Sequence, residues 1–240
     1  MEKIKYLKIF PFENIKNARS LGGYPTTDGK ITSWKSFIRS ANLDNLTEND
    51  MELLKDLNVR TVIDLRRAEE TKYNGEKIDI IKNNFSYYQI SLLPAPMNQE
   101  YIQNILDGEI SIGRSYISLI DNFDAIKKIL EIMANSEGCV LYHCQEGKDR
   151  TGIISMILLL IANSPREIIM ADYEVSSANL GYIDIFKPDE SESIFRITSP
   201  YNIKEAMDYI ISKYENIESY LEKVGIDYKT LKKLKEKMIE

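Results

Sequence analysis

The chain has few of the side chains from which metal sites and catalytic triads are built. Its 240 residues include one histidine, two cysteines and one tryptophan. The histidine, His143, and both cysteines, Cys139 and Cys144, lie within one short stretch. A zinc site needs several such ligands brought together, and a Ser-His-Asp triad needs a histidine that meets a distant serine. Neither arrangement is expected in this protein.

The two cysteines are not expected to form a disulfide. If Cys139 and Cys144 stand at opposite ends of one extended segment, they are about 16 Å apart at roughly 3.3 Å per residue, whereas a disulfide needs Cα atoms within about 7 Å. The sequence therefore predicts two free thiols, which suit a reducing compartment.

Long apolar runs are also missing. Residues 1–12 are interrupted by charge and lack the apolar core of a signal peptide, and the longest mostly apolar run, residues 153–162, is too short to span a bilayer. We therefore expect a cytoplasmic protein without stable membrane insertion, although these features do not distinguish it from a protein exported without a leader.

Positive charge is not in excess. The formal net charge is −6 and the isoelectric point is near 5.1. Nucleic-acid binding needs a clustered basic surface, so no nucleic-acid partner is expected. Any anion site in this chain must be a local feature.

What the chain does have is the composition of an ordinary globular protein, with 43% hydrophobic and 28% charged residues. We expect a single domain over residues 1–240. Apolar periodicity and capping patterns predict strands near residues 31–32, 37–39, 59–65, 87–93 and 139–143, and helices over residues 47–57, 115–134, 151–162, 164–177, 203–224 and 228–239. Strands alternating with helices indicate an α/β fold with a central, mostly parallel sheet flanked by helices.

Three of these segments carry further expectations. The strand at 87–93 is expected to be buried and to stop at Pro94. The helix at 151–162 is apolar nearly all round, which is typical of a central helix. The irregular stretch within 172–200 is interpreted either as a lid over a site or as a segment packed on the core.

The sequence HCQEGKDRTG, residues 143–152, gathers a thiol, a guanidinium and two glycines in one loop. A strand that ends at Cys144 and a helix that begins near Arg150 direct backbone N–H groups and the positive end of a helix dipole into this loop. Such a loop is expected to bind an oxyanion, which Arg150 grips with its fork while Gly147 allows close approach of the backbone. The predicted binding residues are Gln145, Glu146, Gly147, Lys148, Asp149 and Arg150.

Cys144 is the candidate nucleophile of this loop. The helix dipole and the Arg150 guanidinium favour its thiolate over its thiol, so that no separate base is needed. Thr151 is expected to donate its hydroxyl to the sulfur, and His143 to order the loop backbone.

Two alternatives for the same residues were weighed. One is a buried cysteine in a turn before a core helix, without catalytic function. The other, a nucleotide-binding P-loop, is excluded because Tyr142 stands in place of its first glycine and Asp149 where serine or threonine should follow the lysine.

The motif HCQEGKDRTG resembles the signature of the cysteine-dependent protein tyrosine phosphatase superfamily. GKDRTG is similar to the bacterial tyrosine and phosphoinositide phosphatases, a branch that includes secreted mycobacterial and Listeria enzymes. The segments NARSLGGY, VIDLRRAEE and SYLEKVGIDYKTLKKLKEK also look like that branch, so the resemblance spans nearly the whole chain.

The resemblance implies a tyrosine phosphatase-like fold and a two-step hydrolysis. Cys144 attacks phosphorus, a phosphocysteine forms, and water then releases inorganic phosphate. It implies no metal and no other cofactor.

The sequence identifies the acid that protonates the leaving group less clearly than it identifies the nucleophile. The superfamily's usual Trp-Pro-Asp loop is absent, because the sole tryptophan, Trp34, is followed by lysine and serine. Asp149 and Asp64 match aspartates of the family motif and are the candidates. The alternatives are a loop-ordering role for Asp149 and an ion pair of Asp64 with Arg66 or Arg19. Two other aspartates, Asp107 and Asp121, are weaker candidates.

Substrate choice depends partly on further cations. Lys148 beside the loop would favour polyanionic substrates such as phosphoinositides, unless it is only a solvated lysine. Arg19, Arg66 and Arg67 either add to this positive field or form structural ion pairs.

These observations predict a phosphatase that acts on phosphotyrosine in proteins, with dual-specificity or phosphoinositide activity. Two alternatives stay open. One is a sulfurtransferase of rhodanese type, which also surrounds an anion with a cysteine loop. The other is a phosphate-binding module with little turnover, which the missing Trp-Pro-Asp acid would explain.

Overall fold

The central sheet has five strands in the order β1-β2-β5-β3-β4. In the computed structural model, which describes residues 6–72, 75–96, 98–183 and 194–240, these strands are β1 Arg19–Ser20, β2 Phe37–Ser40, β3 Val59–Asp64, β4 Ser86–Gln89 and β5 Cys139–His143. β1 is antiparallel to β2, and the other neighbouring strands are parallel. The predicted α/β fold with a mostly parallel central sheet is therefore confirmed.

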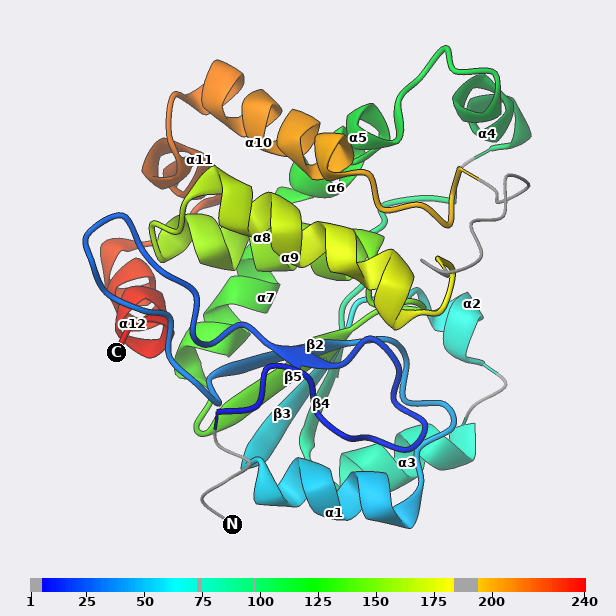
Figure 1. Ribbon diagram of the computed structural model, residues 1–240, viewed down its shortest axis with the longest axis vertical. Helices are drawn as coiled ribbons and strands as arrows, with labels where there is room; N and C mark the ends of the chain where they lie inside the picture. Colours follow the sequence, from blue (N-terminus) through cyan, green and yellow to red (C-terminus); the bar gives the residue numbers. More distant parts are fainter. Residues whose placement is uncertain (1–5, 73–74, 97, 184–193) are drawn as a thin grey trace.

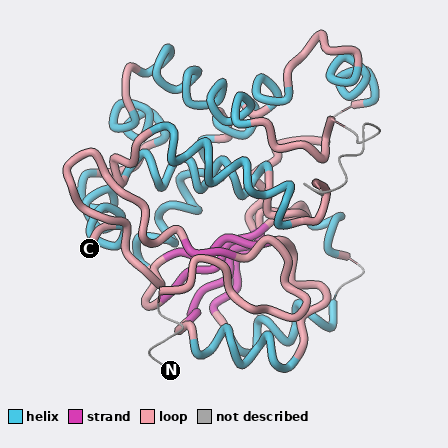
Figure 2. The backbone as a smooth tube through the Cα atoms, in the orientation of Figure 1, coloured by secondary structure: helices cyan, strands magenta, loops and turns pink. Residues whose placement is uncertain are grey.

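Helices cover both faces of the sheet (Figure 1). Figure 2 shows the strands between these two helical layers. α1 and α3 lie on one face, and α7 to α12 lie on the other with the short helices α5 and α6. The bounds are α1 Glu48–Asp56, α2 Ala68–Thr71, α3 Gly75–Asn84, α4 Gln99–Leu106, α5 Ile112–Ser115, α6 Ile117–Ile120, α7 Phe123–Asn135, α8 Asp149–Ile161, α9 Arg166–Asn179, α10 Pro200–Tyr214, α11 Ile217–Val224 and α12 Tyr228–Met238.

β5 is the middle strand and contributes to both hydrophobic cores. Val140 and Tyr142 pack in the larger core, under α7 to α12, whereas Cys139 and Leu141 pack in the smaller core with α1 and α3. This alternation follows from the two-residue period of a strand. All five residues of β5 are buried, and the strand has the bounds that the sequence predicted.

α8 begins directly after the cysteine loop and runs through the larger core. Nearly all its side chains are buried, which confirms the predicted central helix. The predicted N-terminus of α1 is also confirmed. The Thr47 hydroxyl accepts a hydrogen bond from the Asp50 N–H, and the Asp50 carboxylate accepts one from the Thr47 N–H.

Several predicted elements were wrong in extent. β4 ends at Gln89 and is mostly exposed, because it is the last strand of the sheet and pairs only with β3. The predicted helix at 115–134 is interrupted and forms parts of α5, α6 and α7. The predicted helix at 203–224 breaks at Glu215, whose φ is 71°, and Asn216 then caps α11. Residues 31–32 form isolated bridges rather than a strand.

The start of α9 and the segment after it also differ from expectation. Pro165 rather than Ser164 is the N-cap of α9, and the Ser164 hydroxyl has no hydrogen-bond partner among the described residues. The helix runs on to Asn179, and residues 184–193 of the predicted lid segment lie outside the described residues. Within the described part of the chain, no helix is long and apolar enough to cross a bilayer.

Candidate active site

The candidate site lies at the carboxyl end of the parallel strands, where β5 passes into α8. Cys144 directly follows β5, and its side chain is nearly buried, with 3% exposure. Ligands gather at this edge of open α/β sheets because the loops between strands and helices meet there. Both cysteines are free, as predicted.

The carbonyl groups of the loop are turned outward and held by the surrounding protein. The Gln145 carbonyl accepts hydrogen bonds from the backbone N–H and the side-chain amide of Asn42. The Asn17 side chain donates to the carbonyls of Glu146 and Gly147, each at 3.0 Å. Arg39 donates to the Gly147 carbonyl at 2.7 Å.

The N–H groups of the same loop are left for a ligand. Those of residues 145–148 donate to no other group in the described part of the chain, and no side chain caps the N-terminus of α8. Buried N–H groups are almost always hydrogen-bonded in folded proteins. Together with the helix dipole, this arrangement fits an oxyanion.

Gly147 makes the loop possible. Its φ is +67°, and a Cβ atom built on it would lie 2.3 Å from the carbonyl oxygen of Ser40. The group that the loop approaches closely at Gly147 is the end of β2. The close approach to an anion that the sequence predicted at this glycine stays a prediction.

Gly147→Ala is expected to lower the free energy of unfolding by roughly 2 to 5 kcal/mol, because it adds backbone strain to an overlap with β2. Urea unfolding followed by circular dichroism would measure it. Gly29→Ala is the matched control, since Gly29 has a φ of +80° but nothing within 4 Å of the added carbon. Equal losses in the two variants would show that the contact with Ser40 does not constrain the loop.

Arg150 is held by a residue that the sequence did not single out. Its two terminal nitrogens donate to the two carboxylate oxygens of Glu70 at 2.8 and 2.9 Å. Burial opposes the charge of Arg150, but the Glu70 hydrogen bonds and the charge of Cys144 outweigh burial and raise the pKa of Arg150. Glu70 lies in α2, just after β3 and therefore at the same edge of the sheet, which is the signal that would have found it.

Asp64 is an ion-pair partner rather than a free acid. It is fully buried and accepts hydrogen bonds from Arg66 and from the Tyr87 hydroxyl. Burial alone would raise the pKa of Asp64, but His143 and Arg66 outweigh it and lower the pKa. A carboxylate kept ionised in this way is a poor proton donor. Of the two interpretations given for Asp64, the geometry favours the ion pair with Arg66.

His143 touches the backbone of the loop and not the cysteine side chain. Its Nδ1 lies 3.3 Å from the Cys144 carbonyl oxygen, and its Nε2 has no hydrogen-bond partner among the described groups. Burial lowers the pKa of His143, although Asp64 opposes this effect. A buried imidazole that contacts the backbone of the loop agrees with the predicted loop-ordering role.

Asp149 stands at the mouth of the loop. Its Oδ1 accepts a hydrogen bond from the Tyr116 hydroxyl, and its Oδ2 lies 3.5 Å from the Lys148 ammonium. Burial and the neighbouring Asp149 raise the pKa of Tyr116, so this hydroxyl keeps its proton and donates it in a hydrogen bond. Unlike Asp64, Asp149 lines the cavity beside the loop.

The structure differs from the expectation for Thr151 and distinguishes the two interpretations of Lys148. The Thr151 hydroxyl is buried but makes no hydrogen bond to the Cys144 sulfur or to any other described group. Lys148 is not a solvated lysine. Its ammonium is buried and donates to the Phe195 carbonyl, with Glu146 at 3.7 Å.

The distant arginines form structural pairs. Arg66 bridges Asp64 and Asp44, and Arg19 binds Asp172 rather than Asp64. Arg67 lies 3.5 Å from Glu70. None of the three lines the cavity beside the loop.

A cavity of about 550 Å³ opens beside the loop. Its charged lining residues are Glu146, Lys148, Asp149, Arg150 and Arg196. Its apolar lining residues are Leu93, Ile105, Ile112, Tyr116, Leu119 and Phe195, and Cys144 is not among the residues that line it.

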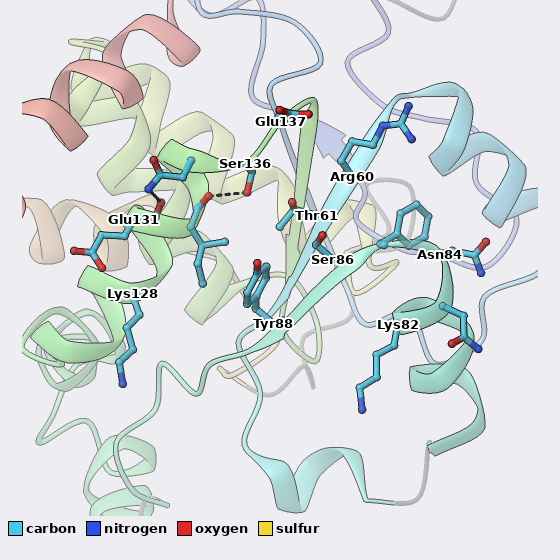
Figure 3. Close-up of a pocket in the computed structure, with 14 residues that line it drawn as sticks. Arg60, Thr61, Lys82, Asn84, Ser86, Tyr88, Lys128, Glu131, Ser136 and Glu137 are labelled. Atoms are coloured by element: carbon cyan, nitrogen blue, oxygen red, sulfur yellow. Dashed lines mark hydrogen bonds between the residues drawn. The ribbon is translucent and has the colours of Figure 1, made fainter.

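A second, larger cavity of about 890 Å³ is unconnected with this chemistry. Figure 3 shows it around Thr61, Ser86 and Tyr88, with charged residues of α3 and α7 at its sides. It lies where β3 and β4 begin, at the opposite edge of the sheet from the cysteine loop, and none of the predicted site residues lines it.

Comparison with known proteins agrees with this geometry. The profile of the tyrosine phosphatase family matches residues 10–240. A tyrosine-protein phosphatase of Nostoc commune is 34% identical over 148 residues, which are 59% of this chain and 48% of that protein. A putative tyrosine-protein phosphatase of Cupriavidus necator is 26% identical over 168 residues, or 68% of this chain and 60% of that protein. The chain thus spans about half of the length of the first relative.

Solved structures show weaker similarity. TpbA of P. aeruginosa has a TM-score of 0.42 and 13% identity, covering 79% of this chain and 86% of that chain. The core catalytic domain of the phosphatase SIW14 of S. cerevisiae has a TM-score of 0.41 and 16% identity, covering 86% and 96%. At this level the similarity adds nothing to the family assignment.

Proposed function

Because the chain belongs to the tyrosine phosphatase family, we propose that it hydrolyses phosphomonoesters through a phosphocysteine intermediate, with phosphotyrosine in proteins as its main substrate. The observation that carries the proposal is the loop around Cys144, whose carbonyls are bound from outside while its N–H groups are unpaired among the described residues. Those N–H groups and Arg150 would bind the three terminal oxygens of the phosphate.

The first step is the attack of the Cys144 thiolate on phosphorus. Charge develops on the phosphoryl oxygens, and preformed N–H donors stabilise such charge without reorganising. Asp149 would donate a proton to the leaving oxygen. In the second step water attacks the phosphocysteine, Asp149 takes up the proton, and inorganic phosphate and the thiolate are released.

The apolar lining of the cavity supports an aromatic ester as substrate. A tyrosine ring whose phosphate is bound by the loop would contact apolar lining residues such as Ile112, Tyr116 and Leu119. Lys148 is occupied by the Phe195 carbonyl and is less available to a second phosphate. Arg196 at the rim is the group that would serve a dual-specificity or phosphoinositide activity, which is our second candidate.

The proposal is tested by measuring phosphate release from a phosphotyrosine peptide and from phosphatidylinositol phosphates in parallel. EDTA is present throughout, and Cys144→Ser is the control. We expect metal-independent release from the peptide, lost in the variant, and slower release from the lipids. Absence of release from both would overturn the proposal. Persulfide formation from thiosulfate would then identify a sulfurtransferase, and phosphate-ester binding without release a binding module.

Asp149→Asn is expected to lower kcat about 100-fold on a phosphoserine peptide and less on a phosphotyrosine peptide, because an alcohol needs a proton to leave more than a phenol does. Steady-state kinetics on the two peptides would measure the difference. Asp64→Asn is the comparison. It removes one of the two carboxylates that Arg66 bridges, so it should lower stability and affect both substrates equally. If Asp64→Asn discriminates between the substrates and Asp149→Asn does not, the acid is Asp64.

A further inference from the structure

Behind the cysteine loop lies a buried cluster of charged groups that reach neither the cavity nor the solvent. It consists of Arg19, Arg39 and Asp172, all at most 2% exposed. They come from β1, β2 and α9, three elements far apart in the sequence. Burying charges is costly unless they are paired and hydrogen-bonded, so such a cluster needs a structural or functional reason.

Asp172 is the hub of the cluster. One carboxylate oxygen accepts a hydrogen bond from Arg39 at 2.5 Å, and the other accepts from Arg19 at 3.0 Å and from the Tyr24 hydroxyl at 2.8 Å. Burial alone would raise the pKa of Asp172, but the charges of Arg19 and Arg39 outweigh it and hold the pKa well below its ordinary value. The carboxylate is therefore ionised and fixes the direction of both guanidinium groups.

Both arginines connect Asp172 to the same peptide unit of the loop through hydrogen bonds. Arg39 binds the Gly147 carbonyl directly, and its contact with the Lys148 carbonyl is longer, at 3.4 Å. Arg19 donates to the side-chain oxygen of Asn17, which points the amide of Asn17 at the carbonyls of Glu146 and Gly147. The Gly147 carbonyl is thus held on the outside of the loop by two routes that start from one carboxylate.

We propose that Asp172 is a positioning residue for the phosphate site. By orienting Arg39 and, through Arg19, Asn17, it keeps the Gly147 carbonyl turned away from the anion and the loop N–H groups turned toward it. A peptide unit that rotated about its axis would present its carbonyl oxygen to the phosphate instead. The two guanidinium groups also outnumber the single carboxylate that they share, which leaves positive charge behind the loop.

This inference rests on the proposed function for its catalytic meaning, but its first readout is the binding of inorganic phosphate. Asp172→Asn is expected to weaken phosphate binding at least about tenfold by titration calorimetry and to lower kcat by about 10- to 100-fold, the range seen when partners that orient a site are removed. The matched control is Ile169→Ala. It destabilises the same helix from its buried apolar side and touches neither arginine, so phosphate binding should stay within about threefold of the native value.

A second variant decides the matter if Asp172→Asn does not fold. Asn17 has a φ of 54°, a conformation that glycine adopts without strain, so Asn17→Gly removes the amide while keeping the backbone. It too should weaken phosphate binding at least about tenfold. Native-like phosphate binding in the folded Asp172→Asn variant, or in Asn17→Gly if that one alone folds, would overturn the positioning role.

The two proposals fail in different ways. A native chain that binds phosphate but releases none from any ester would count against the proposed function only. If the native chain is active and the Asp172→Asn and Asn17→Gly variants bind phosphate and turn over as it does, only the positioning role is overturned. A loss of binding shared equally by Ile169→Ala would assign Asp172 to general stability and also overturn the inference.

Discussion

Cys144→Ser is expected to lose phosphate release by at least about 10⁴-fold, because a serine hydroxyl stays protonated unless a base removes its proton. Among the described residues, neither His143 nor Asp64 is placed to remove it. The single histidine of the chain is buried and faces the backbone carbonyl of residue 144, and Asp64 is engaged by Arg66. A cysteine needs less help, because a thiol is in general more acidic and more nucleophilic than a hydroxyl.

Binding should survive this substitution, because the loop N–H groups and Arg150 are unchanged. A phosphotyrosine peptide is therefore expected to bind Cys144→Ser with native affinity, measured by calorimetry, while turnover is lost. Cys139→Ala is the control. Burial raises the pKa of Cys139 to about 12, so this thiol stays protonated, and its replacement should leave phosphate release intact. Residual turnover of more than about 1% in Cys144→Ser would point to a different nucleophile.

Arg150→Lys is expected to lower kcat/KM by about 10³-fold although the charge is kept. Both terminal nitrogens of Arg150 donate to Glu70, so phosphate would use the remaining N–H groups of the guanidinium. A lysine ammonium has fewer donors and no planar fork, so it cannot bind both partners in the same way. Most of the loss should fall on kcat, since the geometry matters most for the charge that develops in the transition state.

Two companion variants separate the guanidinium from the residue that holds it. Glu70→Gln keeps a hydrogen-bond acceptor but removes the charge, and it should lower kcat/KM about tenfold. Arg196→Lys alters an exposed arginine at the rim of the cavity and should change phosphotyrosine hydrolysis less than about threefold. If Arg150→Lys were no worse than Arg196→Lys, the planar fork of Arg150 would play no part in the reaction.

The centre of the site could be predicted from the sequence because its signals are local. An apolar run of five residues, a cysteine loop with a central glycine and an apolar helix follow one another within residues 139–161. The structure places β5, the loop and α8 there with nearly the predicted bounds. Strand β5, helix α8 and the backbone conformation of Gly147 depend mainly on neighbours along the chain. Sequence patterns can therefore predict them.

The rest of the site could not be predicted, because its contacts join distant segments. The sequence near Arg150 does not indicate that Glu70 will hold it. The position of Glu70 just after β3 becomes a signal only once β3 and β5 are known to be neighbours in the sheet. The exposure of β4 likewise depends on its place at the end of the sheet order, which periodicity does not reveal. The breaks after α6 and at Glu215 were missed because apolar spacing continues across them.

The outward hydrogen bonds of the loop also bear on how the protein folds. Asn17 is separated by 129 and 130 residues from the two carbonyls that it binds, and Arg39 by 108 residues from Gly147. Closing such long intervals costs chain entropy and slows the formation of the contacts concerned. The proposed phosphate site is therefore completed only when the beginning of the chain has joined its middle. A fragment that begins after β2 would carry the whole motif HCQEGKDRTG and still lack Asn17 and Arg39, which hold the carbonyl groups of its loop.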